Sequence, residues 1–407
     1  MEKILFWFLI LLPLKNFAQE FAAEGVKTAQ IRTENADFGW PLCRLGEVLT
    51  LEFDVLDDKY SDLCYSIRHC DSDFEPDDLS FSEFAEGFEN RRLENYENSF
   101  NTHQSFTHYT LNIPNDDVKL LISGNYIIEI FEEDNEDNVV LRKKFMVCDN
   151  FDPSKLSVQV KKPFLTEYSF ECQQVEVSVD NSSLSVFNPE KYIKVYTMRN
   201  MDFSSRQRLE ISGYSGNTVL YQKNSGGNIF QGGSEFEFLD IKDVGFKALG
   251  IDAINYERGV YSYVLTPFEP VDVSYTFLED LNGNYYIKND KGFSRALEAD
   301  YVKVLFRLKY DPFADSVFVY GGMTDFQCDT ASQMHFNPET ELWEKQLVLK
   351  QGLYNFQFVE KDGKGGNFFL QGSWTETENV YFTAVYTSLP KNRGERLVMF
   401  AVVNSLK

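Results

Sequence analysis

Three of the four histidines of the chain fall between residues 69 and 108, and they are the first side chains to consider for metal chemistry. His69 lies beside a cysteine and near two aspartates in IRHCDSD, whereas His103 and His108 are five residues apart in HQSFTH. A zinc site needs three or four imidazole, thiolate or carboxylate ligands that converge on the ion. The spacing of His103 and His108 is not that of H-E-x-x-H, which places two imidazoles on one face of a helix. We therefore interpret all three as structural histidines that form hydrogen bonds, and we expect no metal.

Other sequence patterns that could support catalysis are incomplete. GYSGN (residues 213–217) begins like a nucleophile elbow but lacks the final glycine of G-x-S-x-G. GGNIFQGG (residues 226–233) has neither the Lys-Ser/Thr of a phosphate-binding loop nor a strand–helix context. So acidic a chain offers many carboxylate pairs for glycoside hydrolysis, but the order of the residues selects none of them. We expect no enzyme and no cofactor.

The first 19 residues have the features of a secretory signal peptide. MEKILFWFLILLPLKNFAQ contains a lysine, an apolar run from Ile4 to Leu14 and a small residue at Ala18. The run is too short to span a membrane, and no later stretch approaches the roughly 18 apolar residues that a spanning helix needs. No cysteine follows the run until Cys43, which argues against a lipid anchor at the cleavage point. We expect an exported protein that is not inserted in the membrane.

The net charge of −24 is concentrated in the first part of the chain. Residues 20–150 hold 29 Asp and Glu against 11 Lys and Arg, whereas residues 151–407 hold 33 against 26. So strong a negative charge repels the phosphates of nucleic acids and of anionic lipids. We therefore exclude DNA and RNA as partners. The charge favours either high solubility or a basic surface on a protein partner.

One acidic run, EEDNEDN, lies between two predicted strands at residues 132–138. It is not a calcium loop of the EF-hand type, because no glutamate closes a 12-residue loop. We interpret it as the solvated tip of a hairpin. Its carboxylates are the candidates for contact with a basic partner, and they are Glu132, Glu133, Asp134, Glu136 and Asp137.

The six cysteines are scattered over residues 43–328, unlike the dense framework of a small secreted domain. No C-x-x-C motif occurs, so neither a redox site nor a zinc ribbon is indicated. Bridges between Cys43 and Cys64, or between Cys70 and Cys148, are compatible with an oxidising compartment. The sequence favours neither pairing.

Segments that alternate in polarity, or that are rich in β-branched and aromatic residues, dominate the chain and predict an all-β protein. In the first part we predict strands at residues 49–56, 63–70, 106–113, 125–131 and 139–147. Phe81, Phe84 and Phe88 recur at helical spacing and predict one short helix. Further along, Asn282-Gly283 predicts a tight turn within a hairpin at residues 273–289.

The length of the chain and its succession of strands indicate tandem β-sandwich domains. Strands separated by glycine-rich turns are typical of immunoglobulin-like sandwiches, and nothing in the chain predicts the strand–helix alternation of a parallel α/β fold. We predict a signal peptide at residues 1–19, an N-terminal sandwich at 20–150, a middle β domain at 151–299 and a C-terminal immunoglobulin-like domain at 300–407.

The two-residue alternation of a strand also predicts where two of the histidines point. Within residues 106–113 the odd-numbered positions form the more apolar face, which leaves His108 directed to solvent or to a neighbouring loop. Within residues 63–70, His69 falls on the apolar face with Tyr65 and Ile67.

Several short signatures in residues 26–148 occur in an order that resembles the N-terminal domain of the plug proteins of the Bacteroidota type IX secretion system. The signatures are His69-Cys70-Asp71, Glu83 to Phe88, Ser99 to Thr102, Tyr109 to Asn115 and Ser123 to Tyr126. The chain departs from the family pattern at Phe74, where a tryptophan is expected, which puts one aromatic contact in doubt. We expect the signatures to shape the fold rather than to touch a partner, because such Asn and Pro residues fix turns and a His-Cys-Asp at a strand end satisfies backbone groups.

The resemblance implies a periplasmic protein without catalytic activity. Such a protein would bind the periplasmic opening of the outer-membrane translocon β-barrel of the type IX secretion system, and would occlude it when no cargo is passing. The acidic run at residues 132–138 would then steer the first domain toward a basic rim of the pore.

The rest of the chain resembles the same family more loosely, and a second family also fits the C-terminal part. That part is similar to the early-set sandwiches of the carbohydrate-module class, in which exposed aromatic side chains stack on sugar rings. The alternative function is therefore a periplasmic glycan-binding module. It requires Phe326, Trp343 and Tyr354 to form one exposed aromatic platform.

Overall fold

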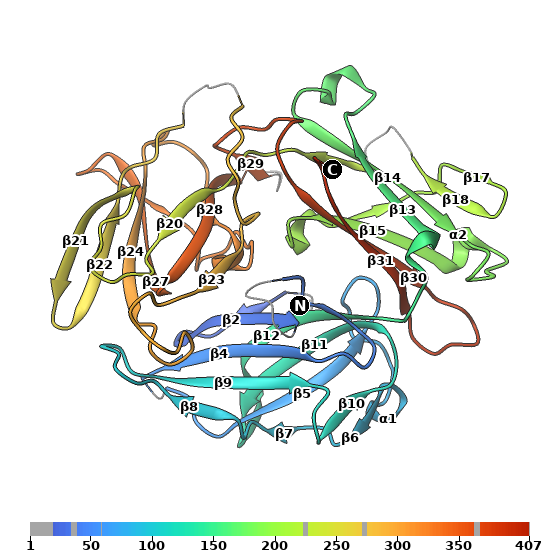
Figure 1. The fold of residues 1–407 in the computed structure, drawn as a ribbon, viewed down its shortest axis with the longest axis horizontal. Coiled ribbons are helices and arrows are strands. Elements are labelled where there is room, and N and C mark those ends of the chain that lie inside the picture. Colours follow the sequence, from blue (N-terminus) through green and yellow to red (C-terminus); the bar gives the residue numbers. More distant parts are fainter. Residues whose placement is uncertain are drawn as a thin grey trace, which may run out of the picture.

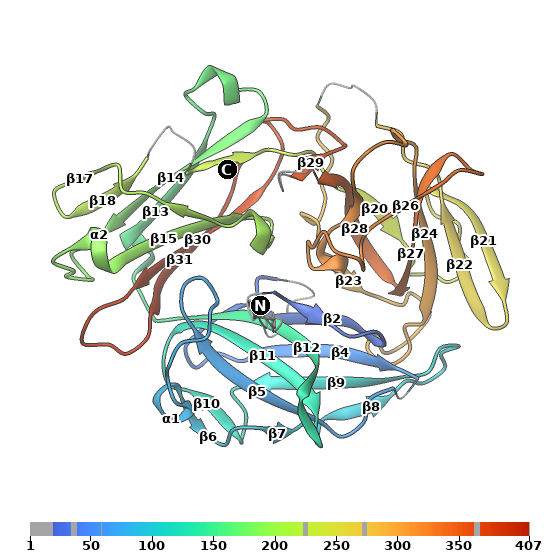
Figure 2. The same ribbon diagram turned by 180° about the vertical axis from the view of Figure 1, so that it is seen from behind.

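The computed structural model describes residues 19–33, 39–57, 59–222, 227–270, 275–361 and 367–406. The predicted signal peptide lies outside these residues, except for its last position. Figure 1 and the reverse view in Figure 2 show three β domains at the corners of a triangle, with the first domain next to both of the others. In the described ranges, no helix is long and apolar enough to cross a membrane.

The first domain is a sandwich of two sheets. Its strands are β1 (Phe21–Ala22), β2 (Val26–Thr33), β3 (Leu42–Arg44), β4 (Leu49–Leu56), β5 (Leu63–Cys70), β6 (Ala85–Gly87), β7 (Arg91–Arg92), β8 (Tyr96–Asn98), β9 (Phe106–Ile113), β10 (Val118–Leu120), β11 (Gly124–Glu132) and β12 (Asn135–Cys148). One sheet has the order β1-β12-β11-β5-β7, with β3 parallel to β12, and the other has the order β2-β4-β9-β8. A small pair, β6 and β10, covers one end.

Alternating side chains explain why these segments form a sandwich. In β4, Leu49, Leu51 and Phe53 are fully buried in the core, whereas Glu52 between them is only half-buried. The short helix α1 (Phe81–Phe84) begins after Ser80, whose side chain forms a capping box with a glutamate one turn later. The predicted helix is thus confirmed, and β4, β5 and β9 have the bounds that the sequence predicts.

The middle domain is formed by strands from two distant parts of the chain. They are β13 (Leu156–Lys161), β14 (Cys172–Asp180), β15 (Ile193–Arg199), β16 (Gln207–Leu209), β17 (Gly213–Ser215), β18 (Thr218–Tyr221), β19 (Ile229–Gln231), β30 (Val380–Thr387) and β31 (Arg396–Asn404). One sheet has the order β13-β14-β18-β17, with β19 also on β14, and the other has the order β16-β15-β30-β31. Helix α2 (Pro189–Tyr192), capped by Asn188, leads into β15.

The third domain contains the strands between these two parts. They are β20 (Glu237–Asp240), β21 (Ile251–Glu257), β22 (Val260–Leu265), β23 (Tyr285–Ile287), β24 (Tyr301–Leu308), β25 (Val317–Tyr320), β26 (His335–Asn337), β27 (Leu342–Lys350), β28 (Gly352–Lys361) and β29 (Asn367–Phe369). One sheet is built around β28, which pairs with β20, β23, β25 and β29. The other has the order β21-β22-β24-β27-β26, with β22 parallel to β24.

The division of the chain predicted at residue 300 does not coincide with a boundary between sheets. Strands β30 and β31 follow that point, yet β30 pairs along its whole length with β15 of the middle domain. Strands β20 to β23 precede it, yet β20 and β23 pair with β28 of the third domain. The chain therefore leaves the middle domain, builds the third and returns, a long-range pairing that local sequence patterns do not reveal.

The hairpin predicted at residues 273–289 is wrong in its first half. Asn282 and Gly283 have φ values of 52° and 81°, as a tight turn of the predicted kind requires. Residues 275–281 form no strand, however, and β23 pairs with β28 instead. Before the turn, the Asp280 carboxylate accepts the backbone N–H groups of Phe236 (2.5 Å) and Asn282 (2.6 Å).

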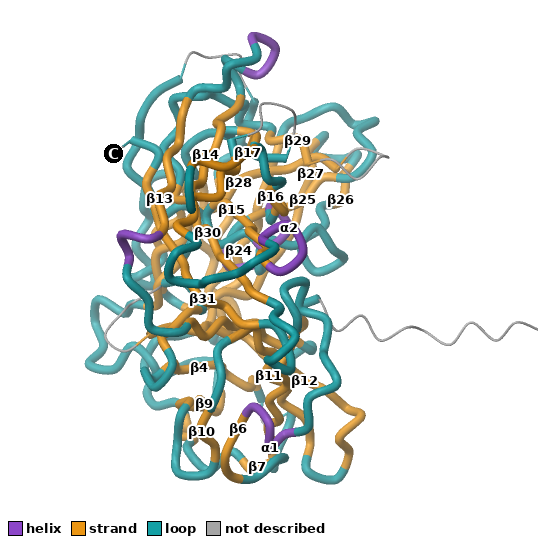
Figure 3. Tube along the Cα trace, turned by 90° about the vertical axis from the view of Figure 1, so that its right-hand side faces the viewer, coloured by secondary structure: helices purple, strands orange, loops and turns teal. Residues whose placement is uncertain are grey.

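Figure 3 shows the molecule from the side, with the strands of the two upper domains overlapping above the first domain. Together with Figure 1, this view indicates that the three domains lie in one flat layer. Within the described ranges, single-turn 3₁₀ helices join the strands at η1 (Pro153–Lys155), η2 (Thr166–Tyr168), η3 (Phe203–Ser205) and η4 (Gly322–Thr324).

Candidate functional site

The acidic run forms the tip of the β11–β12 hairpin, as predicted, and is called the acidic hairpin tip below. Its exposed acidic residues are Glu133, Asp134, Glu136 and Asp137, and Glu132 is half-buried. Figure 2 shows this end of the hairpin on the side of the first domain away from the other two domains. Arg92 of β7 lies 3.7 Å from Glu133, and Asn90 donates a hydrogen bond of 3.1 Å to Glu136. The tip therefore presents negative charge at one extremity of the molecule.

His69 is buried on the apolar face of β5, as predicted, and has a structural role. Its Nδ1 lies 2.5 Å from a carboxylate oxygen of Asp77, and its Nε2 lies 3.3 Å from the carbonyl oxygen of Ser123. A Cβ atom on Gly124 would lie 2.2 Å from Nε2 of this histidine. The Ser-Gly-Asn signature therefore needs its glycine so that His69 can fit.

A loop of the middle domain closes over His69. Gly394, between β30 and β31, has a φ of 74°, and a Cβ atom there would lie 2.8 Å from Leu79 and 3.2 Å from the His69 ring. The neighbouring Arg393 pairs with Glu83 of α1. His69 thus belongs to a contact between two domains.

His108 lies in a network between the first and third domains, so of the two surroundings predicted for it, solvent and a neighbouring loop, solvent is wrong. Its Nδ1 lies 2.7 Å from one oxygen of Asp54 on the adjacent strand. The other oxygen of Asp54 accepts hydrogen bonds from the Tyr301 hydroxyl and the Lys350 ammonium group, both at 2.6 Å. The prediction failed because the third domain, rather than solvent, covers the outer face of β4 and β9 at this point.

The charges of this Asp54 network are almost fully removed from water. Asp54 and Lys350 are each 1% exposed, and Tyr301 is 3% exposed. Desolvation lowers the pKa of Lys350 and raises the pKa of Tyr301. Because a buried charge is costly unless it is paired, the two ions stabilise the molecule only when the first and third domains are docked. The network therefore favours the one arrangement of the first and third domains in which both ions are paired.

The backbone around the Ser99-to-Thr102 signature also binds the third domain. The N–H of Phe100 donates to the carbonyl oxygen of Leu297 at 2.9 Å. The N–H groups of His103 and Gln104 donate to the two oxygens of the Asp300 carboxylate, at 2.8 and 3.1 Å. His103 therefore forms this hydrogen bond through its backbone N–H and not through its imidazole.

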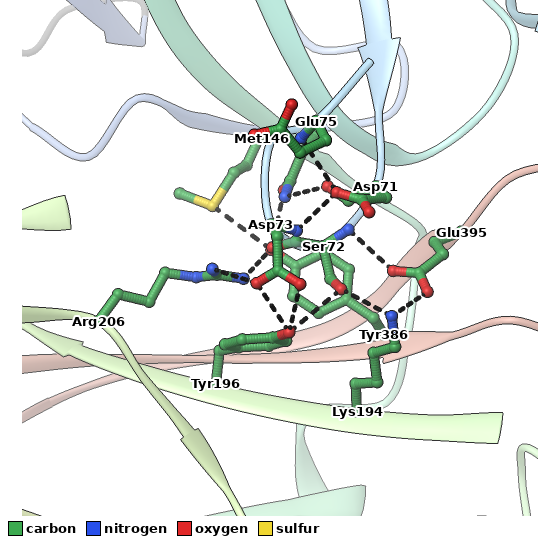
Figure 4. A network of polar contacts seen from close by, with 11 residues as sticks. Asp71, Ser72, Asp73, Glu75, Met146, Lys194, Tyr196, Arg206, Tyr386 and Glu395 are labelled. Carbon is green, nitrogen blue, oxygen red and sulfur yellow. Dashed lines mark hydrogen bonds and ion pairs between the residues drawn. The ribbon is translucent and has the colours of Figure 1, made fainter. Parts of the chain in front are cut away.

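The contact between the first and middle domains centres on the loop of residues 71–75, which follows β5 (Figure 4). The Tyr196 hydroxyl donates to the two oxygens of Asp73, at 3.0 and 3.1 Å. The Arg206 guanidinium lies over the Tyr196 ring at 3.6 Å, reaches Asp73 at 3.3 Å and donates to the Ser72 carbonyl. Two side chains of the middle domain thus hold this loop from below.

The same loop is held from a second side by the β30–β31 connection (Figure 4). The N–H of Ser72 donates to the Glu395 carboxylate at 2.8 Å, and Glu395 pairs with Lys194 of β15. The Tyr386 hydroxyl of β30 donates to Asn125 at 2.8 Å, and Asn125 in turn donates to the carbonyl of Asp71. Asn125 belongs to the Ser123-to-Tyr126 signature, so this signature serves the same contact.

Phe74 fills the apolar part of this contact, so the aromatic interaction placed in doubt by the missing tryptophan is present. Phe74 is 2% exposed, stacks edge-to-face on Phe203 at 5.3 Å and lies beneath the Lys144 ammonium group at 5.0 Å. The surrounding apolar cluster spans both domains and contains Leu42, Cys70, Ile127, Met146 and Cys148 of the first, with Tyr196, Met198, Phe382, Ala384, Tyr386 and Leu397 of the middle one.

The aromatic platform required for glycan stacking is not formed. Phe326 is 5% exposed, Trp343 is 8% exposed and Tyr354 is 1% exposed. Trp343 and Tyr354 belong to the core of the third domain, whereas Phe326 belongs to a separate small cluster with Tyr320. Trp343 lies in β27, Tyr354 lies in β28 and Phe326 lies in the turn after η4, and the surfaces of all three rings are used for packing.

A cavity of about 570 Å³ lies between the first and third domains. Strands β1, β2 and β12 border it on one side, and residues 322–331 border it on the other. At its edge Lys143 pairs with Asp325 at 2.5 Å and with Glu20 at 3.7 Å. These ion pairs join the two domains, and the cavity is the space left between them.

Neither of the two bridges considered from the sequence is formed, because Cys43, Cys64, Cys70 and Cys148 are free thiols. Five of the six cysteines are buried, and Cys328 is half-buried. Burial raises the pKa of the Cys43 thiol to about 12 and of the Cys328 thiol to about 11, so these groups stay protonated and unreactive at neutral pH.

Among the described residues, one group of carboxylates is close enough to hold a metal ion. Glu235, Asp280 and Glu378 each offer an oxygen, and these oxygens lie within 4.8 Å of one another. The sequence did not single out this group, which we call the carboxylate cluster, because its members are far apart in the chain. In this region the sequence predicts only the tight turn at Asn282-Gly283.

The Asp54 network was also missed. The available signal was a charged residue in the middle of the apolar strand β4, and a lysine at the end of β27. Neither residue type predicts a partner in another domain. The site that the structure does reveal is a set of contacts that joins three sandwiches into one body with a projecting acidic tip.

Comparison with known proteins agrees with this architecture. A solved crystal structure of a hypothetical protein from Parabacteroides merdae superimposes with a TM-score of 0.89 at 26% sequence identity, covering 94% of this chain and 98% of that chain. The all-β class predicted from the sequence is therefore confirmed over nearly the whole length. No curated protein matches the chain.

The family model described as Type 9 secretion system plug protein 1st domain matches residues 26–149. The matched segment contains all the signatures noted in the sequence, and it coincides with the first sandwich. The family is a domain of a secretion system and not an enzyme family. Residues 26–149 are therefore similar to the first domain of type 9 secretion system plug proteins.

Proposed function

We propose that the protein is a non-catalytic plug of the type IX secretion system. It would bind the periplasmic opening of the outer-membrane translocon β-barrel and occlude it when no cargo is passing. The observation that carries this proposal is the match of residues 26–149 to the first domain of plug proteins. The predicted signal peptide supports a periplasmic location, because it would direct the chain across the inner membrane.

The three-domain body supports occlusion as the mechanism. A stopper has to keep its shape against the pore, and this shape depends on contacts between domains. The Asp54 network joins the first domain to the third through buried polar groups, and the contacts of residues 71–75, which include the buried Ser72, join it to the middle domain. Such contacts have few alternative arrangements, because each buried charge must keep its partner.

Binding has to be firm and yet reversible, since cargo must later pass. An interface of about 1,600 Å² in total is enough for a specific complex, and it can be released by a competing partner that binds one state better. We place the acidic hairpin tip at the rim of this interface, because exposed charges of one sign mainly accelerate association with a basic surface.

A glycan-binding function has no comparable support. The three aromatic side chains that it needs are buried, and two of them belong to a core that would have to open before a sugar could stack on them. We therefore do not propose it.

The test is affinity purification of the tagged mature chain from detergent-solubilised outer membranes, with mass spectrometry of the proteins that follow it. We expect a very large β-barrel in near-equal amount with the bait. A tagged exported protein of similar size and acidity serves as the control for charge-driven recovery. Absence of any barrel, with the bait intact, would leave a shared fold without a shared partner and would overturn the proposal.

A further inference from the structure

The chain crosses twice between the middle and third domains, and acidic residues gather where the crossings meet. The first crossing joins β19 to β20 and contains Glu235, and the second joins β29 to β30 and contains Glu378. The turn before β23 brings Asp280 and Asn282 to the same place. Oxygens of the three carboxylates lie within 4.8 Å of one another.

Among the described residues, these carboxylates have no positive partner. In the described part of the chain, no Lys, Arg or His forms an ion pair with Glu235, Asp280 or Glu378. Their hydrogen bonds come from neutral donors: the Tyr275 hydroxyl and the N–H of Glu378 on Glu235, two backbone N–H groups on Asp280, and the Asn282 and Asn404 amides on Glu378. Three like charges at this separation repel one another unless a cation lies between them.

Two buried oxygen atoms at this place lack a donor altogether. Glu235 is 9% exposed, and its Oε2 is buried without a hydrogen-bond partner. The Oδ1 of Asn282 is also buried and unpartnered, while its amide nitrogen donates to Glu378 at 2.9 Å. Buried acceptors without a donor are rare and costly in native proteins. A bound cation would satisfy both of them at once.

From this geometry we infer that the carboxylate cluster is a binding site for a hard divalent cation of the calcium class. The donors are carboxylate oxygens of Glu235, Asp280 and Glu378 and the amide oxygen of Asn282, with water completing the shell. An all-oxygen set without His or Cys does not favour Zn²⁺. Ca²⁺ accepts an irregular shell of six to eight oxygens, whereas Mg²⁺ requires a nearly regular octahedron.

The electrostatics of the cluster agree with a missing positive charge. Burial, with a contribution from the neighbouring glutamates, raises the pKa of Asp280 to about 7. Burial likewise raises the pKa of Glu235. A cation would reverse both shifts, because it favours the ionised carboxylates.

The site lies where both crossings pass, so the ion has a structural consequence. Glu378 is two residues before β30 of the middle domain, and Asn404, which donates to it, ends β31. Asp280 and Asn282 belong to the third domain. The cation therefore fixes the angle between these two domains, as the Asp54 network fixes the angle between the first and third.

The test uses the mature chain after treatment with a chelator and exchange into metal-free buffer at pH 8, where Asp280 is largely ionised. We expect titration calorimetry with CaCl₂ to show one site per chain and to raise the melting temperature. Glu235→Gln and Asp280→Asn should weaken binding by about tenfold or more. Glu376→Gln, an exposed neighbour outside the cluster, should bind as the parent chain does.

A second measurement keeps the inference testable if a variant proves unstable. Tyr275 donates to Glu235 and lies 6.2 Å from Trp374, so excitation of these rings should sensitise Tb³⁺ bound in the cluster. We expect Tb³⁺ emission that CaCl₂ displaces in the parent chain. Absence of calcium binding by the folded parent chain at millimolar CaCl₂, or binding that Glu235→Gln and Asp280→Asn leave unchanged, would overturn the site.

Discussion

Two junctions between domains differ in whether the chain neutralises their buried carboxylates. At the first–third junction, the Asp54 carboxylate has the Lys350 ammonium group at 2.6 Å, and both residues are 1% exposed. At the middle–third junction, the oxygens of the carboxylate cluster approach within 4.8 Å, and the described residues provide no cation for them. At the first junction the chain itself provides the positive charge. At the second junction the positive charge has to come from a bound ion.

The difference teaches which parts of the molecule can respond to their surroundings. A junction closed by two protein charges changes only when one of them is removed or when the domains separate. A junction that needs an external ion responds to the concentration of that ion and to pH. The first domain should therefore stay docked on the third under conditions that loosen the middle–third junction.

The largest effect should follow from removal of the cation at the first–third junction. Lys350→Met leaves the Asp54 carboxylate buried with only the Tyr301 hydroxyl and His108 as partners, which should lower the free energy of unfolding by about 3–5 kcal/mol. Urea unfolding measures this loss.

Two variants decide whether the pairing itself is the cause. Lys303→Met removes an exposed lysine of the neighbouring strand β24 and should change the free energy of unfolding by no more than about 0.5 kcal/mol. Asp54→Asn combined with Lys350→Met should recover part of the loss, because no unpaired charge remains. Equal losses in the single and the double variants would contradict the account of the Asp54 network.

A smaller effect with a characteristic pH dependence should distinguish the carboxylate cluster. The pKa of Asp280 is raised by burial to about 7, above its ordinary value of 3.8. The folded state therefore holds a proton that the unfolded state releases, and this stabilisation is lost as pH rises through 7. Without calcium, the free energy of unfolding should fall between pH 5 and pH 8, by about 2–3 kcal/mol.

Asp280→Asn should remove most of this slope, and CaCl₂ should reverse it by stabilising the ionised cluster at pH 8. Melting temperatures of both chains at several pH values, with and without calcium, make the comparison. A slope that is the same in Asp280→Asn would assign the pH dependence to other groups. The Lys350 variant should leave the calcium response unchanged, because the two junctions are separate.

A still more local effect is expected where the first domain meets the middle one. Arg206→Ala removes the cation over the Tyr196 ring and the pairing with Asp73, and should cost about 1 kcal/mol. Hydrogen exchange should accelerate in residues 71–75 and remain slow in β4 and β27. Arg208→Ala, an exposed arginine two residues further on in β16, is the control. Faster exchange throughout the molecule would show that this contact is not a local one.

The smallest effect on stability should come from the acidic hairpin tip. Replacement of its five carboxylates by amides should change the free energy of unfolding by no more than about 0.5 kcal/mol, because they are at the surface. The same change should slow association with the proposed translocon partner at low salt. Glu339→Gln with Glu341→Gln, at an exposed turn of the third domain, is the matched control. An unchanged association rate at low salt would remove the tip from the interface.

Local patterns were enough to predict five strands of the first domain, β4, β5, β9, β11 and β12, but not its other strands. The alternation in β4, β5 and β9 gave their bounds and placed His69 correctly, because one face of each strand fills the core of its own sandwich. The same reasoning failed for His108, since the other face of β9 is buried by a domain that begins more than a hundred residues later. Alternating polarity shows that a strand has two different faces, but it does not show what covers the second face.

The same limit explains what was missed at the sites. The pairing of β30 with β15, the partner of Asp54 and the members of the carboxylate cluster all depend on contacts between distant segments. The family signatures contained part of this information. The histidine of His69-Cys70-Asp71 lies under the β30–β31 loop, and Asn125 accepts a hydrogen bond from the Tyr386 hydroxyl. These signatures therefore shape the contacts between domains as well as the fold of the first domain.

The central claim is that the three-domain body closes a large pore, and it can be measured directly. The purified translocon barrel is placed in a planar bilayer, and its conductance is recorded before and after addition of the mature chain to the periplasmic side. We predict that the conductance falls to near zero at saturation, and that it recovers when the chain is washed out. An open-pore conductance that persists with the chain bound would contradict occlusion as its function.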